Sequence, residues 1–274
     1  MTSLDGPSGN IALLIDADNA SAAHFDPVMT VLAELGTVNI RRAYGNWSKA
    51  TLKSWAALSI AQAIEPQQQF DLTKGKNATD MKMTIDAMDL MASGRVSGFG
   101  LMSSDSDFTP LVTRIRQQGI PVYGFGRMSS PEGFRRACTR FIDVMALAEV
   151  DAEDPVVEKA TSPARARKAD EKKAQPAKAA PPAPTPVPAQ PSAPSIKKAV
   201  DAEVIKLLID AYDSVKRDER GFVRLGSVGQ LAGNRSSFDV RNYGYKRLSD
   251  LVQAIPNFIT ESREGGQVWI KRVN

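Results

Sequence analysis

The first half of the chain alternates between segments with strand character and segments with helical periodicity. The strand segments are short and bounded by turn residues, which is typical of strands buried in a parallel sheet. They lie at residues 11–15, 37–42, 99–102 and 122–125. The helical patterns lie between and after them, at residues 25–35, 47–60, 77–91 and 108–118. This alternation predicts an α/β domain in which helices cover both faces of a parallel sheet.

The helical segment at residues 77–91 has a clear apolar periodicity and a clear end. The residues that we expect to form its buried face are Met81, Ile85, Met88 and Leu90. Gly94 stands just past the last of them, at a position where glycine commonly ends a helix.

The last quarter of the chain has a separate pattern. Apolar residues predict two helical faces, with Val204, Leu207, Leu208 and Tyr212 in the first and Leu248, Leu251, Val252 and Ile255 in the second. Residues 267–273 alternate like a strand, and Phe258 and Ile259 precede a Gly-Gly pair that would close a hairpin. Helices followed by a hairpin predict a small α+β winged-helix domain.

A segment of biased composition separates the two patterns. Residues 155–200 hold 10 of the 17 prolines and are nearly half alanine and proline, so they cannot bury enough apolar surface to offset the entropy of ordering. We therefore predict one domain at 1–154, a disordered Ala/Pro/Lys-rich linker at 155–198 and a second domain at 199–274. The segment 155–200 carries a net charge of +6, more than the +4 of the whole chain, so the positive charge is no sign of a basic first domain.

Residue usage excludes several kinds of site. A single cysteine, Cys138, allows neither an intramolecular disulfide nor a cysteine-based zinc site. A single histidine, His24, argues against a histidine-rich metal centre. No apolar stretch approaches the ~20 residues of a membrane span, and the first residues do not resemble a signal peptide. We therefore expect no membrane association and a cytoplasmic protein.

Acidic residues stand where the apolar runs end. Asp16 follows the first strand segment, and Asp105 and Asp107 follow the third. Asp80 stands in the first turn of the helix predicted at 77–91. The carboxyl ends of parallel strands form the ligand-binding edge of an open α/β sheet, so we expect these carboxylates to converge. Clustered carboxylate oxygens suit Mg²⁺ or Mn²⁺, and such a centre hydrolyses phosphodiesters, most simply those of RNA.

Two other interpretations of these acids stay open. Asp80 and Asp107 lie at helix starts, where a carboxylate also serves as a cap or interacts favourably with the helix dipole. Asp16 and Asp18 after a strand also resemble the first motif of haloacid-dehalogenase-type phosphatases. That family expects threonine or valine where Ala20 stands, and a lysine before the later acidic pair, where the nearby cation is an arginine.

Polar and basic residues near the acids are candidates for contact with a phosphate-bearing substrate. Asn19 and Ser104 adjoin the acidic residues and are placed to orient the substrate or a water molecule. The basic candidates are Arg41, Arg42, Lys74 and Lys76. Aromatic residues follow the two arginines, and unpaired bases stack on such rings with about 1–3 kcal/mol per base.

The order and spacing of these motifs resemble one known family. The strings Ile15-Asp-Ala-Asp-Asn19, Lys74-Gly-Lys-Asn-Ala-Thr-Asp80 with Asp86, and Ser104-Asp-Ser-Asp-Phe108 are similar to those of the NYN domain, a PIN-like nuclease family, and most similar to its LabA-like branch. The resemblance covers roughly residues 9–150. It implies a Rossmann-like PIN fold and ribonuclease activity. It also implies an acidic Mg²⁺ or Mn²⁺ site formed by Asp16, Asp80, Asp105 and Asp107, with Asn19 beside them.

A second resemblance covers the C-terminal pattern. Residues 221–231 and 238–251 are similar to the OST-HTH, or LOTUS, domain, a family associated with RNA binding and, in some members, with protein partners. Basic side chains position RNA through its phosphates without reading its sequence. The side chains expected to do so here are Arg235, Arg241, Lys246 and Arg247.

The sequence therefore predicts a Mg²⁺- or Mn²⁺-dependent ribonuclease whose RNA, most simply single-stranded, is recruited by the C-terminal domain. A tether between the domains would raise the effective concentration of bound RNA at the acidic site. The alternative is a catalytically silent regulator that binds RNA or a protein partner through the same domains. The sequence leaves the oligomeric state open.

Overall fold

The structure is a computed structural model, and it describes residues 9–70, 77–151, 200–263 and 265–273. The linker expected at 155–198 lies outside the described residues, as do Lys74 and Lys76. Among the helices in the described ranges, none has the length and apolar character needed to cross a membrane.

Six parallel strands form the sheet of the N-terminal domain, in the order β3-β2-β1-β4-β5-β6. The strands are β1 (Asn10–Asp16), β2 (Thr37–Gly45), β3 (Glu65–Gln68), β4 (Gly98–Met102), β5 (Val122–Gly126) and β6 (Arg140–Asp143). β1 and β4 are neighbours although two strands separate them along the chain. The carboxyl ends of β1 and β4 therefore lie side by side at the point where the strand order reverses, which is the usual ligand-binding position of such sheets.

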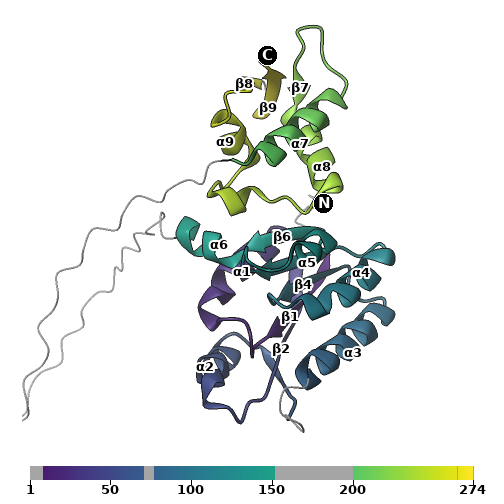
Figure 1. The fold of residues 1–274 in the computed structure, drawn as a ribbon, viewed down its shortest axis with the longest axis vertical. Coiled ribbons are helices and arrows are strands. Elements are labelled where there is room, and N and C mark those ends of the chain that lie inside the picture. The colour runs from purple at the N-terminus through teal and green to yellow at the C-terminus, as the bar shows by residue number, and fades with distance from the viewer. Residues whose placement is uncertain (1–8, 71–76, 152–199, 264, 274) are drawn as a thin grey trace, which may run out of the picture.

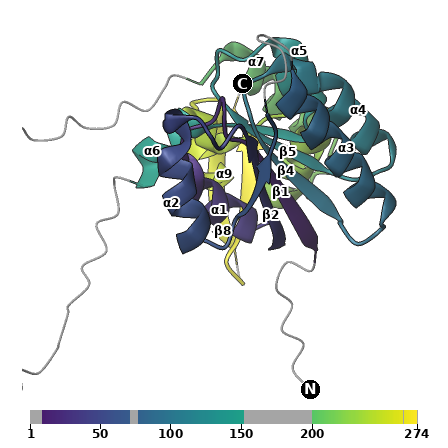
Figure 2. The same cartoon turned by 90° about the horizontal axis from the view of Figure 1, so that it is seen from below.

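Helices cover both faces of this sheet, as the sequence predicts (Figures 1 and 2). The α-helices are α1 (Phe25–Ala33), α2 (Lys53–Ala61), α3 (Ala78–Ala92), α4 (Thr109–Gln117), α5 (Glu132–Ala137) and α6 (Val144–Asp151). Short 3-10 turns are η1 (Ala22–His24), η2 (Ala50–Leu52) and η3 (Ser106–Phe108). Leu13 and Ile15 of β1 pack with α1, α2 and α6, whereas Ala12 and Leu14 pack with α3, α4 and α5. The alternation of side chains along a strand thus supplies both cores.

The buried face of α3 differs from the one expected. The buried residues of this helix are Thr79, Met83, Ala87 and Leu90. Met81 and Ile85 are 62% and 57% exposed, so their expected burial is wrong, whereas that of Leu90 is confirmed. The rotation of the helix is fixed by Asp86, which accepts hydrogen bonds from Arg42 and Tyr44 of β2. Gly94 has a φ of 66°, a left-handed conformation that glycine adopts readily, and the chain leaves α3 there as expected.

The C-terminal domain is a small α+β unit. Its elements are α7 (Ala202–Asp213), β7 (Val223–Arg224), α8 (Leu225–Arg235), η4 (Val240–Tyr243), α9 (Leu248–Gln253), β8 (Phe258–Arg263) and β9 (Gln267–Arg272). The three strands are antiparallel in the order β7-β9-β8, and the β8–β9 hairpin is the predicted one. Leu208, Val228 and Leu251 are fully buried between the helices and this sheet. The predicted sequence of helices followed by a hairpin is therefore confirmed.

Candidate metal centre

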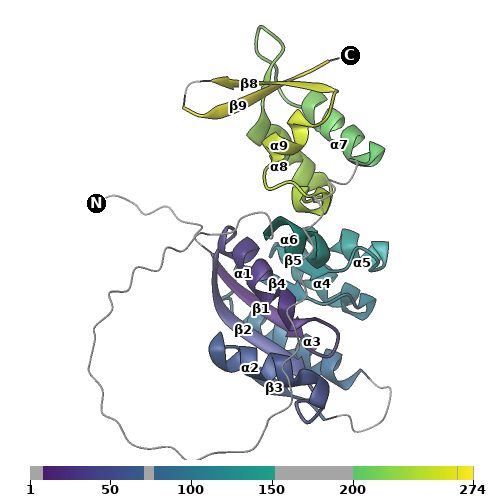
Figure 3. The same ribbon diagram turned by 90° about the vertical axis from the view of Figure 1, so that its left-hand side faces the viewer.

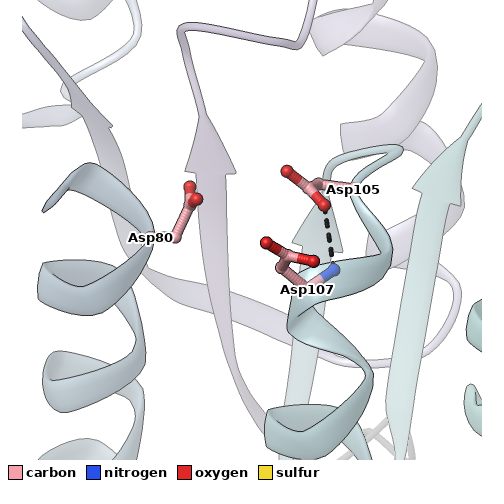
Figure 4. A group of neighbouring side chains, drawn as sticks. All are labelled: Asp80, Asp105 and Asp107. Carbon is pink, nitrogen blue, oxygen red and sulfur yellow. Dashed lines mark hydrogen bonds between the residues drawn. The ribbon is translucent and has the colours of Figure 1, made fainter. Parts of the chain in front are cut away.

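Three of the four acids predicted to converge do so at the switch point of the sheet. Asp80, Asp105 and Asp107 each offer a carboxylate oxygen, and these oxygens all lie within 4.8 Å of one another. Figure 4 shows Asp80 on α3 opposite Asp105 and Asp107 on the turn that follows β4, with the carboxylates directed toward a common space. The cluster therefore joins two segments that are distant in the sequence.

Local backbone structure explains how the turn after β4 presents two carboxylates. Asp105 is the N-cap of η3, and its Oδ1 accepts a hydrogen bond from the backbone N–H of Asp107 at 2.9 Å. The side-chain amide of Asn77 donates to Oδ2 of Asp107 at 2.5 Å, which links the start of α3 to this turn. The capping role considered for Asp107 thus belongs to Asp105. The cap leaves the other carboxylate oxygen of Asp105 available to the cluster.

Asp16 lies beside the cluster but outside the group of three. It is fully buried at the end of β1, and both of its carboxylate oxygens accept hydrogen bonds. The donors are the side-chain amide of Asn19 at 2.9 Å, the hydroxyl of Ser103 at 2.8 Å and the backbone N–H of Asn19 at 3.3 Å. Burial raises the pKa of Asp16 above its usual range, and these hydrogen bonds counter part of the shift.

The environment of the site raises the pKa of Asp80. Burial, as the larger cause, and the negative charges of its neighbours together raise the pKa of its carboxyl to about 6. Those neighbours are Asp16, Asp105, Asp107 and Asp18. Like charges this close disfavour full ionisation unless a cation offsets them.

The chemistry of the donor set fits a hard divalent cation. Three carboxylates supply oxygen ligands only. Two of them are half-buried and the third is exposed, so positions for water or a phosphate oxygen remain accessible. The pKa of Asp80 is raised first by burial and then by the neighbouring carboxylates, and a bound cation would offset the second effect. The residues that would hold such an ion are Asp80, Asp105 and Asp107.

The polar residues around the acids connect the strand ends. The side-chain amide of Asn19 donates to Asp16, and the hydroxyl of Ser104 accepts a hydrogen bond from the backbone N–H of Arg127 at 2.9 Å. Ser103, which the sequence reasoning did not select, binds Asp16 and the backbone N–H of Asp105. Its place directly after an apolar strand, two residues before Asp105, is the sequence signal that could have identified it.

The basic residues predicted near the acids have other partners. Arg42 forms ion pairs with Glu65 and Asp86 at 2.9 Å each, and Arg41 donates to the backbone carbonyl of Gln62 at 2.9 Å. The structure therefore uses both arginines to join β2 to its neighbours rather than bringing them to the acidic cluster. The described residues do not include Lys74 and Lys76.

The four basic residues predicted to contact RNA in the C-terminal domain divide into two groups. Arg235, Lys246 and Arg247 are exposed. Arg241 is mostly buried, with its side chain 12% exposed, and forms ion pairs with Asp239 and with Glu34 of α1.

The fold and the cluster define a class of protein. A parallel sheet with helices on both faces and carboxylates gathered at its switch point is the architecture of a PIN-like nuclease domain. The model of the NYN domain matches residues 10–148, and that of the OST-HTH/LOTUS domain matches residues 195–270. The chain belongs to the NYN domain family and carries an OST-HTH domain after it.

Individual proteins that resemble this chain have low sequence identity to it. The uncharacterized protein MJ0482 of Methanocaldococcus jannaschii is 27% identical over a match of 137 residues, which covers 48% of this chain and 52% of that protein. The match thus spans about half of the length of this curated relative. The crystal structure of VPA0982, a protein of unknown function from Vibrio parahaemolyticus, is 20% identical with a TM-score of 0.42, covering 52% of this chain and 96% of that one. The solution structure of an uncharacterized protein from locus NE0665 of Nitrosomonas europaea is 27% identical with a TM-score of 0.26, covering 33% of this chain and 90% of that one.

Proposed function

We propose that this protein is a divalent-metal-dependent ribonuclease that hydrolyses RNA phosphodiesters at the acidic cluster. The observation that carries the proposal is the convergence of Asp80, Asp105 and Asp107 at the switch point of an NYN fold. The OST-HTH domain supports RNA as the substrate. The nuclease is favoured over a phosphatase, because the family match covers the whole acidic pattern.

Each acidic residue has a role in this proposal. Asp80, Asp105 and Asp107 would hold Mg²⁺ or Mn²⁺, and Asp16 completes the set from the buried side, where it adds to the negative potential acting on Asp80. A cation bound there would activate a water molecule and neutralise charge on the scissile phosphate. Asn19 and Ser103 hold the carboxylate of Asp16 in one orientation through their hydrogen bonds.

RNA recruitment is assigned to the exposed basic residues of the OST-HTH domain. Arg235, Lys246 and Arg247 would contact phosphates, which gives affinity without sequence selection. Single-stranded RNA is the substrate form we favour, since it reaches an open cluster without prior unwinding. Ser104 and Asn19 are proposed to orient the substrate or a water molecule at the acids. A protein partner and the cytoplasmic location stay predictions.

The test uses purified full-length protein and end-labelled single-stranded RNA. Cleavage is followed with Mg²⁺, with Mn²⁺ and with EDTA. The Asp80→Asn variant removes one carboxylate from the cluster, and Asp89→Asn is the matched control, since Asp89 is an exposed acid on the same helix. We expect metal-dependent cleavage by the wild type and by Asp89→Asn, and a loss of about 100-fold or more in Asp80→Asn, as expected when one metal ligand is removed.

The possible results separate the nuclease from the silent regulator. Cleavage that Asp80→Asn leaves intact would exclude the cluster as its source. RNA binding by all three proteins without any cleavage, across several RNAs and both metals, would instead establish the regulator. Comparing rates with Mg²⁺ and Mn²⁺ also determines which cation supports the reaction.

A further inference from the structure

The C-terminal domain covers the outer edge of the NYN sheet. β6 is the last strand of the sheet, and only its β5 side is paired within the sheet. On its other side, η4 of the OST-HTH domain packs against β6 and α6. The backbone N–H of Phe141 donates to the backbone carbonyl of Ser237 at 3.1 Å. Figure 1 shows this domain next to β6, and Figure 3 shows it on the side of the NYN domain where α6 lies.

Asn242 acts on β6 as a residue of an added strand would. Its Oδ1 accepts a hydrogen bond from the backbone N–H of Asp143 at 2.8 Å, and its Nδ2 donates to the backbone carbonyl of Phe141 at 2.9 Å. A neighbouring strand offers one acceptor and one donor in the same way. Asn242 is 6% exposed, so these bonds are shielded from water. A carboxamide supplies both functions, whereas a carboxylate supplies only the acceptor.

Charged residues frame this contact. Arg241, next to Asn242, pairs with Glu34 of the NYN domain and with the buried Asp239 of its own domain. On the other flank, Arg136 of α5 pairs with Glu203 of α7 at 3.2 Å. The exposed pair of Arg136 and Glu203 adds little stability, but charge pairs across a contact select one orientation.

We propose that the β6 edge is a docking site for the OST-HTH domain of the same chain, with Asn242 as its recognition residue. The two domains then work as one docked body, which goes beyond the proposed nuclease activity and does not depend on it. The covalent connection favours the domain of the same chain, because it makes the contact intramolecular and raises the effective concentration of that domain. In this arrangement Arg241 serves docking, and RNA contact belongs to Arg235, Lys246 and Arg247.

Amide hydrogen exchange on the full-length protein tests the docking directly. The backbone N–H groups of Phe141 and Asp143 have their acceptors in the OST-HTH domain, so their exchange reports the docked state. The Asn242→Asp variant keeps the size of the side chain and the acceptor but places a carboxylate against the carbonyl of Phe141. Asn234→Asp is the matched control, because Asn234 is an exposed residue of the same domain.

We expect slow exchange at both amides in the wild type and in Asn234→Asp. In Asn242→Asp, exchange should accelerate roughly 10–100-fold, the change that follows when a buried polar group loses its partner. Protection of the amides in the β8–β9 hairpin and in β1 must be retained, which shows that both domains are still folded.

A second variant opens the contact from the NYN side. Glu34→Arg places a cation against Arg241 and leaves the OST-HTH domain unchanged, so it excludes misfolding of that domain as the cause of faster exchange. We expect the same two amides to accelerate in this variant. Fast exchange in the wild type would overturn the proposal. A dimer whose dissociation exposes both amides, seen by light scattering, would also overturn it, because the domain would then dock on a second copy.

Discussion

The most informative perturbation is to remove one negative charge from the acidic cluster. In the metal-free protein the carboxyl of Asp80 has a pKa of about 6 instead of 3.8, so its ionised form is disfavoured by folding. Because the pKa of Asp80 is higher in the folded protein than in the unfolded chain, the folded state is favoured most below about pH 4, where the carboxyl is protonated in both states. This contribution to the free energy of unfolding is lost as the pH rises through about 6. A shift of about two pKa units corresponds to about 3 kcal/mol. Asp80 is only half-buried, and solvent screening reduces this to about 1 kcal/mol.

The asparagine of the Asp80→Asn variant does not ionise, so the variant does not lose stability through ionisation at this position. In EDTA at pH 7.5 we therefore expect the variant to be more stable than the wild type by about 1 kcal/mol, which raises Tm by about 3 °C for a domain of this size. The wild type should gain stability when Mg²⁺ is added, by about 2.7 kcal/mol at 100 times its Kd. The variant should gain much less. Thermal unfolding followed by circular dichroism, with and without metal, measures both effects.

The opposite result would refute the electrostatic reasoning. If Asp80→Asn lowers Tm in EDTA at pH 7.5, the carboxylate stabilises the fold, as a helix-cap interaction would. If the Tm difference between variant and wild type is the same at pH 4 and pH 7.5, ionisation of Asp80 does not contribute. If Mg²⁺ stabilises both proteins equally, the cation binds elsewhere.

Three further outcomes are expected. RNA cleavage should fall as the pH drops below about 6, because protonated Asp80 no longer offers a charged ligand, and a pH–rate profile checks this. Asn19→Ala removes a hydrogen bond from Asp16 and should reduce cleavage about 10–100-fold with RNA affinity unchanged, as measured by single-turnover kinetics and filter binding. Gly126→Ala places a Cβ 2.6 Å from a backbone carbonyl oxygen and should destabilise the protein by about 1–3 kcal/mol in urea, whereas Gly133→Ala, which has open space, should not.

Local patterns were sufficient to locate the acids of the candidate site. Asp16 and Asp105 follow apolar runs, and parallel strands bring their carboxyl ends to one edge, so their proximity could be inferred without coordinates. The depth at which Asp16 lies does not follow from these patterns. Asp16 is enclosed by Asn19 and Ser103, and its separation from the group of three depends on packing that no local pattern encodes.

The edge strand β3 and the rotation of α3 depend on contacts between residues far apart in the sequence, and local patterns do not predict them. β3 has the polar sequence Glu-Pro-Gln-Gln and lies at the sheet edge, where no apolar alternation is required, so it was missed. The rotation of α3 depends on the contact of Asp86 with Arg42 and Tyr44, residues more than 40 positions away. Arg42 also pairs with Glu65 of the edge strand β3, a partner that its sequence position does not reveal.

The reversal of strand order between β1 and β4 divides the acidic residues between the two halves of the sheet. The segment that runs through β1, β2 and β3 supplies Asp16, and the segment that begins at β4 supplies Asp105 and Asp107, with Asp80 on the helix between them. Neither half of the sheet holds a complete acidic set. The proposed acidic site therefore depends on the pairing of β1 with β4, which brings the two halves of the sheet together.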